Sequence, residues 1–139
     1  SSFCKKGFKS KHNSNYWCNE SYIGYGPGAH SYDKKYRYWN IRDNKEYVNR
    51  IKNRKSYFES EKLTNTQKIN EFIITRIRTM EGINNLELKN LNGICLFKEK
   101  DKEIKYLKDE SLIDVKENRI VLTNRGKKIV DNIIEKISF

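Results

Sequence analysis

Apolar side chains recur at helical spacing through the second half of the chain. Thr64 and Gln67 form a T-x-x-Q capping box, and Gly82 can end the helix that follows. The apolar stripe of this helix is Ile69, Phe72, Ile73, Ile77 and Met80. Two shorter apolar sets predict a second helix, stopped by Gly93, and a third helix: Leu86, Leu88 and Leu91, then Ile104 and Leu107. The pattern predicts three helices in succession.

A hairpin and a closing helix follow these three helices. The apolar segments 112–115 and 120–122 flank Lys116-Glu117-Asn118-Arg119, a polar turn between two short strands. Thr123 then caps a helix whose apolar stripe is Ile129, Val130, Ile133, Ile134 and Ile137. Helices, a two-stranded wing and a final helix are the order typical of a winged-helix module.

Residues 1–60 have a different character. They hold eight of the nine tyrosines and both tryptophans, and they show no long helical period, so we expect strands and loops. One short helix is predicted, because Asp43 and Glu46 form a D-x-x-E capping pattern before Arg54, with Tyr47, Val48 and Ile51 on one face. Such a segment cannot close a barrel or a sandwich alone. We therefore expect a partner domain on its amino-terminal side.

The composition indicates a folded chain in a reducing compartment. With 139 residues, 36% hydrophobic and 34% charged, the chain is polar but too rich in apolar side chains for disorder. We expect neither a membrane span nor a signal peptide, because no apolar run is long enough to cross a membrane and residues 1–7 lack an apolar core. Cys4, Cys18 and Cys95 are an odd number of widely spaced thiols, which favours free cysteines and the cytoplasm. They do not form the CxxxCxxC pattern of a radical-SAM cluster.

The net charge of +11 favours an anionic partner, either nucleic acid or an anionic surface such as a membrane contacted peripherally. A compositional cause competes, because Lys, Asn and Ile are the residues that an AT-rich genome supplies. Residues 1–60 hold 13 basic and 5 acidic residues, whereas residues 61–139 hold 16 and 13. A winged-helix DNA-binding module would need the charge in its own half, so we expect no specific nucleic acid partner.

Two short segments carry candidate chemistry. The segment 24–31 contains alternating glycines but not the GxGxxG spacing, so a dinucleotide site is rejected. Its glycines allow close backbone approach or positive φ, or they belong to a plain loop. His12 lies between basic residues and the aromatic Tyr16 and Trp17. A neutral imidazole can ligate haem iron, aromatic rings can pack on a porphyrin, and lysines 5, 6, 9 and 11 can meet its propionates, although a lone histidine is usually only solvated.

These segments resemble the radical-SAM haem chaperones, a family related to oxygen-independent coproporphyrinogen III oxidase. His12-Asn13-Ser14-Asn15-Tyr16-Trp17 matches the HNxxYW motif of that branch, and the string from Tyr22 to Tyr32 follows at family-like distance. The resemblance continues through Tyr38-Trp39-Asn40, Tyr47, Glu71-Phe72 to Gly82, and Leu122 to Gly126. It covers nearly the whole chain.

The resemblance implies an α+β fold in two parts. Residues 1–57 would be the tail of a radical-SAM partial (β/α) barrel, and residues 58–139 a small helical, winged-helix-like carboxy-terminal domain. The rest of the radical-SAM domain, with its 4Fe-4S cluster and S-adenosylmethionine, would lie upstream. This chain alone would then be no enzyme and contain no catalytic residue.

The resemblance also implies a function, namely binding haem and delivering it to haem-acceptor apo-proteins. The alternatives are an oxygen-independent coproporphyrinogen III oxidase of porphyrin biosynthesis and a winged-helix DNA-binding module. His12 would be a haem-iron ligand, and the loop after an apparent strand at Tyr22–Ile23 would face S-adenosylmethionine. The expected cofactor-binding residues are His12, Asn13, Tyr16, Trp17, Gly24, Gly26, Gly28, Ala29 and His30.

Overall fold

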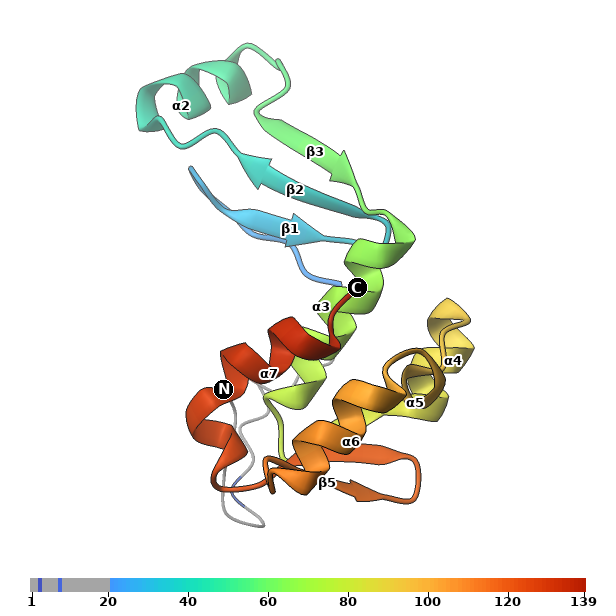
Figure 1. Ribbon diagram of the computed structural model, residues 1–139. Coiled ribbons are helices and arrows are strands. Elements are labelled where there is room, and N and C mark those ends of the chain that lie inside the picture. The colour runs from blue at the N-terminus through green and yellow to red at the C-terminus, as the bar shows by residue number, and fades with distance from the viewer. Residues whose placement is uncertain (1–2, 4–7, 9–20) are drawn as a thin grey trace. The chain divides into compact units, whose positions relative to one another are not determined.

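The computed structural model describes Phe3, Phe8 and residues 21–139. By packing, the chain divides into two compact units, and Figure 1 labels most of their helices and strands. We call residues 19–64 the sheet unit and residues 65–139, which Phe3 also contacts, the helical unit. The division after residue 57 stays a prediction; residues 58–64 pack with the sheet unit.

Three antiparallel strands and one helix form the sheet unit. β1 (His30–Tyr32), β2 (Tyr36–Asn40) and β3 (Phe58–Lys62) are ordered β1-β2-β3, and α2 (Asn44–Lys52) connects β2 to β3. The strands expected in this half are therefore present. β3 was not specifically predicted, because its sequence Phe-Glu-Ser-Glu-Lys has no apolar alternation and all five residues are exposed.

Helix α2 begins as the sequence predicted. The Asp43 carboxylate accepts a hydrogen bond from the Glu46 backbone N–H at 2.7 Å, which satisfies one of the free donors of the first turn. Glu46 then pairs with Arg50 at 2.6 Å, one turn further along. The chain leaves the helix at Arg54, whose φ is +52°.

The sheet unit has little core of its own. Among its described residues only Asn40 and Leu63 are buried, and α2 buries none. Three short strands and a single helix remove too little apolar surface from water to be strongly stable alone. The prediction that this segment depends on further strands is consistent with that sparse burial.

The helical unit contains most of the regular structure. Its elements, in chain order, are α3 (Asn65–Ile77), β4 (Ile83–Asn84), α4 (Asn85–Asn92), α5 (Leu96–Glu99), α6 (Asp101–Asp109), β5 (Ile113–Lys116), β6 (Arg119–Leu122), the 3-10 turn η1 (Gly126–Ile129) and α7 (Val130–Ile137). The strands form an antiparallel sheet in the order β4-β6-β5. The predicted helices and the hairpin are confirmed, whereas β4 and α5 were not foreseen.

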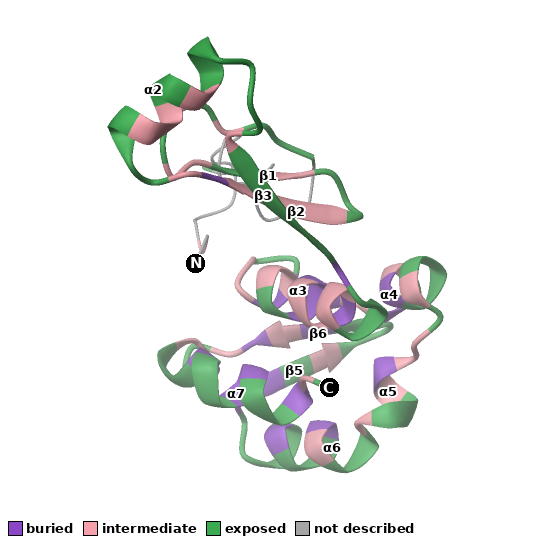
Figure 2. Cartoon of the chain, turned by 90° about the horizontal axis from the view of Figure 1, so that it is seen from above, coloured by how far each residue is buried: buried purple, intermediate pink, exposed green. Residues whose placement is uncertain are grey.

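One apolar core joins all the helices of this unit. Figure 2 shows its buried positions as purple stretches on α3, α4, α5, α6 and α7 and on the hairpin. Leu86 and Leu91, predicted on the stripe of the second helix, are 50% and 66% exposed, and of the three predicted leucines Leu88 alone is buried. The core residues are Ile69, Phe72, Ile73, Ile77, Ile83, Leu88, Leu96, Ile104, Leu107, Leu112, Ile113, Ile120, Leu122, Val130, Ile133, Ile134 and Ile137.

The end of the first long helix differs from the prediction. α3 stops at Ile77, and Met80, expected on its stripe, lies beyond it and is 46% exposed. Gly82 does not end the helix. It takes φ +66° beside β6, where an added Cβ would lie 2.0 Å from the Ile120 carbonyl oxygen. Only glycine allows this approach, which brings the chain to the edge where β4 pairs with β6.

The closing helix starts with a tighter turn than expected. The Thr123 hydroxyl accepts a hydrogen bond from the Gly126 backbone N–H at 3.0 Å, so the predicted cap is present. The first turn after it is the 3-10 turn η1, and α7 begins only at Val130. Ile129 is consequently 40% exposed, while the remaining members of the predicted stripe are buried.

The last residue of the chain is held by the first helix of the unit. The Asn70 side-chain amide donates to the Phe139 carbonyl oxygen at 2.7 Å and accepts from the Phe139 N–H at 2.8 Å. The Lys100 ammonium lies 4.9 Å from the centre of the Phe139 ring.

The helices of the described residues are all too short or too polar to cross a lipid bilayer.

Candidate functional site

The glycine-containing segment forms a tight turn before β1. A bridge joins Tyr22 to Tyr32 through two backbone hydrogen bonds of 3.0 and 2.9 Å, so the strand expected at residues 22–23 is a single bridge. Gly26 and Gly28 have φ of +96° and +68°, and a Cβ on Gly24 would lie 2.2 Å from the His30 carbonyl oxygen. Both roles predicted for the glycines are present, although the close approach is to the chain's own backbone.

Asn40 anchors this turn to the end of β2. Its side chain is 5% exposed, and its amide nitrogen donates to the Gly26 carbonyl oxygen at 2.9 Å. Its backbone N–H donates to the Ala29 carbonyl oxygen at 2.9 Å, and the Gly28 N–H donates to the Ile41 carbonyl oxygen at 3.0 Å. These bonds fix both sides of the turn, so its conformation is set by the sheet.

A pocket of about 170 Å³ lies beside the turn, within the sheet unit. Its walls come from the turn, from one face of the sheet, from α2 and from the segment before β3. The polar groups are few, an amide and several hydroxyls, and the rest is aromatic or aliphatic. The lining residues are Ile23, Gly24, Tyr25, Ser31, Tyr38, Asn40, Tyr47, Tyr57 and Phe58. A small apolar or planar group fits such a pocket.

Four of the five aromatic rings that line the pocket form a chain of edge-to-face contacts. The ring centres of Tyr38 and Phe58 are 5.7 Å apart, those of Phe58 and Tyr57 5.5 Å, and those of Tyr57 and Tyr47 5.4 Å. Their interplanar angles of 75°, 79° and 82° are those that the ring quadrupoles favour. The wall is therefore held by ring contacts rather than by burial.

One end of this wall is tied to the turn between β1 and β2. The Tyr38 hydroxyl donates to the Asp33 carboxylate at 2.7 Å, a bond that raises the pKa of Tyr38. Asp33 also accepts the backbone N–H groups of Tyr36 and Lys35, at 2.7 and 2.9 Å. Hydrogen bonds from the Tyr36 N–H, the Tyr38 hydroxyl and the Lys35 N–H lower the pKa of Asp33.

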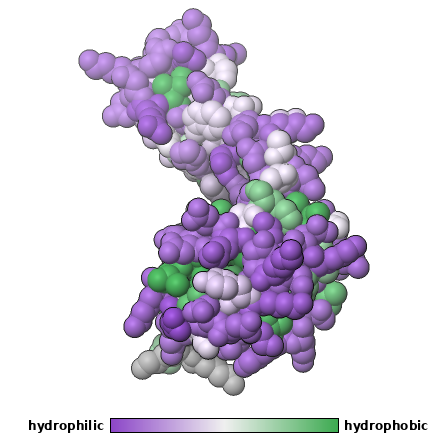
Figure 3. All heavy atoms as spheres, in the orientation of Figure 1, coloured by the Kyte–Doolittle hydropathy of each residue, from purple (hydrophilic) through white to green (hydrophobic). Residues whose placement is uncertain are grey.

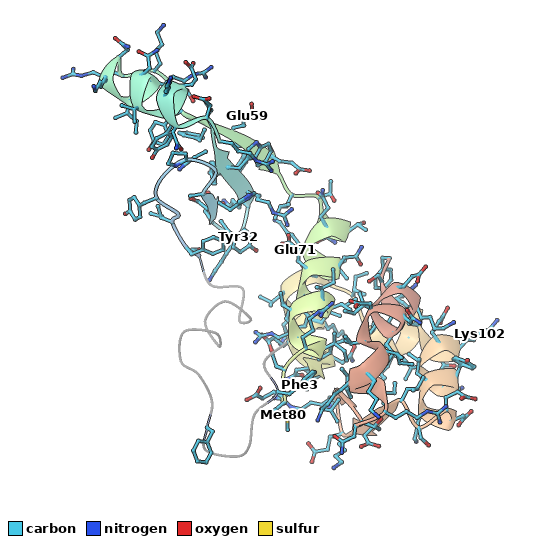
Figure 4. The ribbon with its side chains drawn as sticks, turned by 90° about the vertical axis from the view of Figure 1, so that its left-hand side faces the viewer. Phe3, Tyr32, Glu59, Glu71, Met80 and Lys102 are labelled. Carbon is cyan, nitrogen blue, oxygen red and sulfur yellow. The ribbon has the colours of Figure 1, made fainter. Side chains whose placement is uncertain are left out.

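His30 lies on the opposite face of the sheet from the pocket. Successive residues of a strand point to opposite faces, and Ser31 lines the pocket, so His30 and Tyr32 project away from it. His30 is exposed and pairs with Trp39, whose indole N–H donates to the Glu59 carboxylate at 2.9 Å. Figure 4 labels Tyr32 and Glu59 in this unit. Burial raises the pKa of Tyr32.

The structure gathers some of the predicted site residues and not others. Gly24, Gly26, Gly28 and Ala29 form one turn, whereas His30 faces away from the pocket beside it. The predicted residues His12, Asn13, Tyr16 and Trp17 lie outside the described residues. The sequence reasoning missed the pocket lining of Ser31, Tyr38, Asn40, Tyr47, Tyr57 and Phe58, although the concentration of tyrosines before residue 60 was its signal.

The described residues do not form a metal centre. Among the described residues, no group of three or more histidine, cysteine or acidic side chains could hold an ion. Cys95 lies in the helical unit, where its sulfur accepts from the Asn85 side-chain amide at 3.5 Å, an interaction that lowers the pKa of the thiol. A 4Fe-4S cluster needs several cysteine ligands, and the three in this sequence lack the required spacing.

Several curated proteins with similar sequences are named haem chaperone HemW. The chain is 31% identical over 134 residues to the haem chaperone HemW of Bacillus subtilis, 31% over 136 residues to that of Lactococcus lactis, and 28% over 138 residues to that of Mycobacterium tuberculosis. These alignments cover 96%, 98% and 99% of the chain but only 35%, 36% and 33% of the relatives. No protein-family model matches the chain.

A solved structure shares the fold. It is coproporphyrinogen III oxidase (HemN) from Escherichia coli, described as a radical SAM enzyme, with a TM-score of 0.67 and 18% sequence identity. The superposition covers 84% of this chain and 28% of the oxidase chain. That match concerns the fold alone, whereas the sequence matches extend over nearly the whole chain. The chain spans about a third of the length of the relatives that it matches, and over nearly all of its own length its sequence is similar to that of the haem chaperones named HemW.

Proposed function

We propose that this chain is the carboxy-terminal part of a cytoplasmic protein that binds haem and delivers it to haem-acceptor apo-proteins. The observation that carries the proposal is the 31% identity to a haem chaperone over 96% of the chain. Coproporphyrinogen oxidation is the weaker candidate, because its support is a fold match at 18% identity. The two functions place different demands on the chain, since a chaperone must hold and release haem without changing it.

Within this proposal the two segments of the sheet half have different tasks. His12 ligates the haem iron, Tyr16 and Trp17 pack against the porphyrin, and Asn13 completes the motif. The turn from Gly24 to His30 belongs to the tail of a partial barrel and faces S-adenosylmethionine. An upstream domain supplies the 4Fe-4S cluster. The rule that barrel active sites lie at the carboxyl ends of strands holds for parallel strands. It does not by itself locate a site in this sheet, because β1, β2 and β3 are antiparallel.

For the helical unit we propose a winged-helix-like module that does not read DNA. The order of α3, α4, α6 and the β5–β6 hairpin, with β4 completing the sheet, supports the architecture. Residues 65–139 hold 15 basic and 12 acidic residues, too small an excess for a duplex-binding face. Duplex binding measured by fluorescence anisotropy should be weak and independent of sequence. Sequence-selective binding at physiological salt would make the DNA-binding reading the better one.

Haem titration of the full-length protein, followed by Soret absorbance, tests the main proposal. His12→Ala should lower the haem affinity and change the Soret maximum, because an axial ligand is lost. His30→Ala is the matched control, since His30 is an exposed histidine of the sheet unit. It should leave resting haem binding unchanged.

Two results would contradict the proposal. If His12→Ala binds haem as the unchanged protein does, His12 is not the ligand. If the full-length protein binds no haem at all, and converts coproporphyrinogen III in the presence of S-adenosylmethionine, the oxidase assignment replaces the chaperone. Where the full-length protein does bind haem, transfer of that haem to an apo-protein such as apo-myoglobin distinguishes delivery from simple binding.

A further inference from the structure

Two polar side chains of the aromatic pocket keep a hydrogen-bonding group that the fold does not use. The Ser31 hydroxyl oxygen accepts the Gly24 N–H at 3.0 Å, which leaves the hydroxyl hydrogen to be donated elsewhere. The Asn40 amide nitrogen donates to the Gly26 carbonyl oxygen at 2.9 Å, and none of the described residues donates to the Asn40 Oδ1 oxygen. Asn40 is only 5% exposed, so an oxygen in such a place needs a donor from solvent or from a ligand.

These two side chains lie on the same face of the sheet. Ser31 stands opposite Tyr38 in the pairing of β1 with β2, and Asn40 lies two residues further along β2. Side chains two residues apart on a strand share a face, and diagonal neighbours on adjacent strands are close enough for one aromatic ring to bridge them. The pocket therefore offers one donor and one acceptor from a single side.

The remaining lining favours a neutral, planar ligand. None of the described residues that line the pocket carries a charge, so an ionic ligand would lose its hydration without meeting an opposite charge. The chain of aromatic side chains instead offers ring faces and edges against which a flat ring packs well. A volume of about 170 Å³ is below the roughly 300–1,000 Å³ of pockets for drug-sized ligands, so a single ring fits and a porphyrin does not.

We propose that this pocket binds a neutral, single-ring nitrogen heterocycle whose edge carries an N–H next to a carbonyl, the arrangement found in a pyrimidine base such as uracil. The ligand N–H donates to Asn40 Oδ1, the ligand carbonyl accepts the Ser31 hydroxyl hydrogen, and the ring packs against the aromatic wall. The inference goes beyond haem binding and does not depend on it, because the pocket is lined entirely by described residues of the sheet unit and is too small for a porphyrin.

A small molecule fits the pocket better than a side chain of a partner protein does. A tryptophan indole can only donate a hydrogen bond, so it would leave the Ser31 hydroxyl hydrogen without an acceptor. An asparagine or glutamine amide could meet both polar groups but has no ring to cover the aromatic wall. Figure 3 shows the sheet unit from one side as mainly hydrophilic with a small hydrophobic group near α2, and the described residues drawn there form no broad apolar patch of the kind that marks many protein interfaces.

Titration of the isotope-labelled 139-residue chain with uracil, followed by NMR, tests this assignment. Backbone amide resonances of Gly24, Ser31 and Tyr57 should shift, whereas those of α6 should not. A dissociation constant on the order of 1 mM is expected for so small a ligand. Dimethyluracil, in which both ring nitrogens carry a methyl group, is the matched ligand control. It keeps the ring and both carbonyls but has no N–H to donate to Asn40, so it should bind at least about fivefold more weakly.

Two variants test the polar edge and the aromatic wall separately. Ser31→Ala removes the donor and should weaken uracil binding about fivefold, whereas Ser60→Ala, at an exposed position of β3 outside the pocket lining, is the matched control and should leave binding unchanged. Tyr57→Leu removes one ring of the wall and should weaken the binding of uracil and of dimethyluracil by the same factor. Circular dichroism confirms that each variant is folded. If Ser31→Ala disturbs the turn, the comparison of the two ligands on the unchanged chain still tests the polar edge.

Three outcomes would overturn the assignment. The first is the absence of shifts at the pocket amides when uracil reaches about ten times the expected dissociation constant. The second is equal affinity for uracil and dimethyluracil, which would mean that the pocket does not recognise a ligand N–H. The third is tighter binding of N-acetyltryptophanamide than of uracil, which would make the pocket a site for an aromatic side chain of a partner protein.

Discussion

Replacing Asn40 with alanine should release the glycine turn while leaving the sheet in place. The side-chain amide of Asn40 donates to the Gly26 carbonyl oxygen at 2.9 Å, and that oxygen also accepts the Ala29 N–H at the longer distance of 3.2 Å. The backbone bond from Asn40 to Ala29 is independent of the side chain and remains. The substitution therefore removes one of the fixed points of the turn without breaking β2.

The expected magnitude follows from those bonds. Loss of one partly buried hydrogen bond, with the acceptor still held by a second donor, costs about 1 kcal/mol, and loss of packing of a residue only 5% exposed adds to it. A total of about 1–2 kcal/mol corresponds to local opening about five to thirty times more frequent.

Hydrogen exchange with mass spectrometry measures this opening. Peptides that cover residues 24–31 should exchange faster by that factor in Asn40→Ala, while peptides from α6 serve as an internal reference. Asn40→Asp should loosen the turn at least as much, because its carboxylate cannot donate and faces the Gly26 oxygen. Asn90→Ala, at an exposed position of α4, is the control. Unchanged exchange at residues 24–31 in both Asn40 variants would show that the backbone alone sets the turn.

Three further predictions concern stability. Gly82→Ala should lower the free energy of unfolding by about 3 kcal/mol, because a left-handed alanine is strained and its Cβ would meet the Ile120 carbonyl oxygen. The midpoint of thermal denaturation should fall by about 10 °C or more, and an unchanged midpoint would contradict the close approach. Ile73→Ala should cost about 2–5 kcal/mol in urea denaturation, since Ile73 has 0% exposure, and a loss well below this range would mean that the core collapses around the site. Because the pKa of Asp33 is lowered in the folded chain, its stabilisation of the β1–β2 turn is complete above its usual pKa of 3.8 and is lost as pH falls below that through the folded pKa; exchange at Tyr36 should rise there, and Asp33→Asn should remove the pH dependence.

The sequence carried more information about the helical unit than about the sheet unit. Each of its main helices buries one side, so apolar residues recur in the sequence at helical spacing, as Ile69, Phe72 and Ile73 do. The predicted helix ends were less accurate. Gly82, which predicted the end of α3, instead makes a tertiary contact with β6, and no local sequence pattern encodes that contact. Short β4 was missed for the same reason, since two residues show no alternation.

The pocket was out of reach of sequence reasoning for a related reason. Tyr38, Tyr47 and Phe58 come from three separate elements, and only the pairing of β2 with β3 brings them together. Motif matching selected the turn, because its residues are contiguous, and the structure adds that strand alternation turns the His30 side chain to the face away from the pocket. Contiguity in sequence is a poor guide to which side of a sheet a residue serves.

The contact of Asn70 with Phe139 has a consequence for how the helical unit folds. The two residues are 69 positions apart, and they join the first helix of the unit to its last residue. Closing so long a loop is entropically costly before any contact rewards it, so α3 and α7 should dock late and together. Once docked, neither end can fray without releasing the other. The unit should therefore fold slowly for its helical content but open as a single cooperative block, and its two terminal helices should share one protection level in native-state exchange.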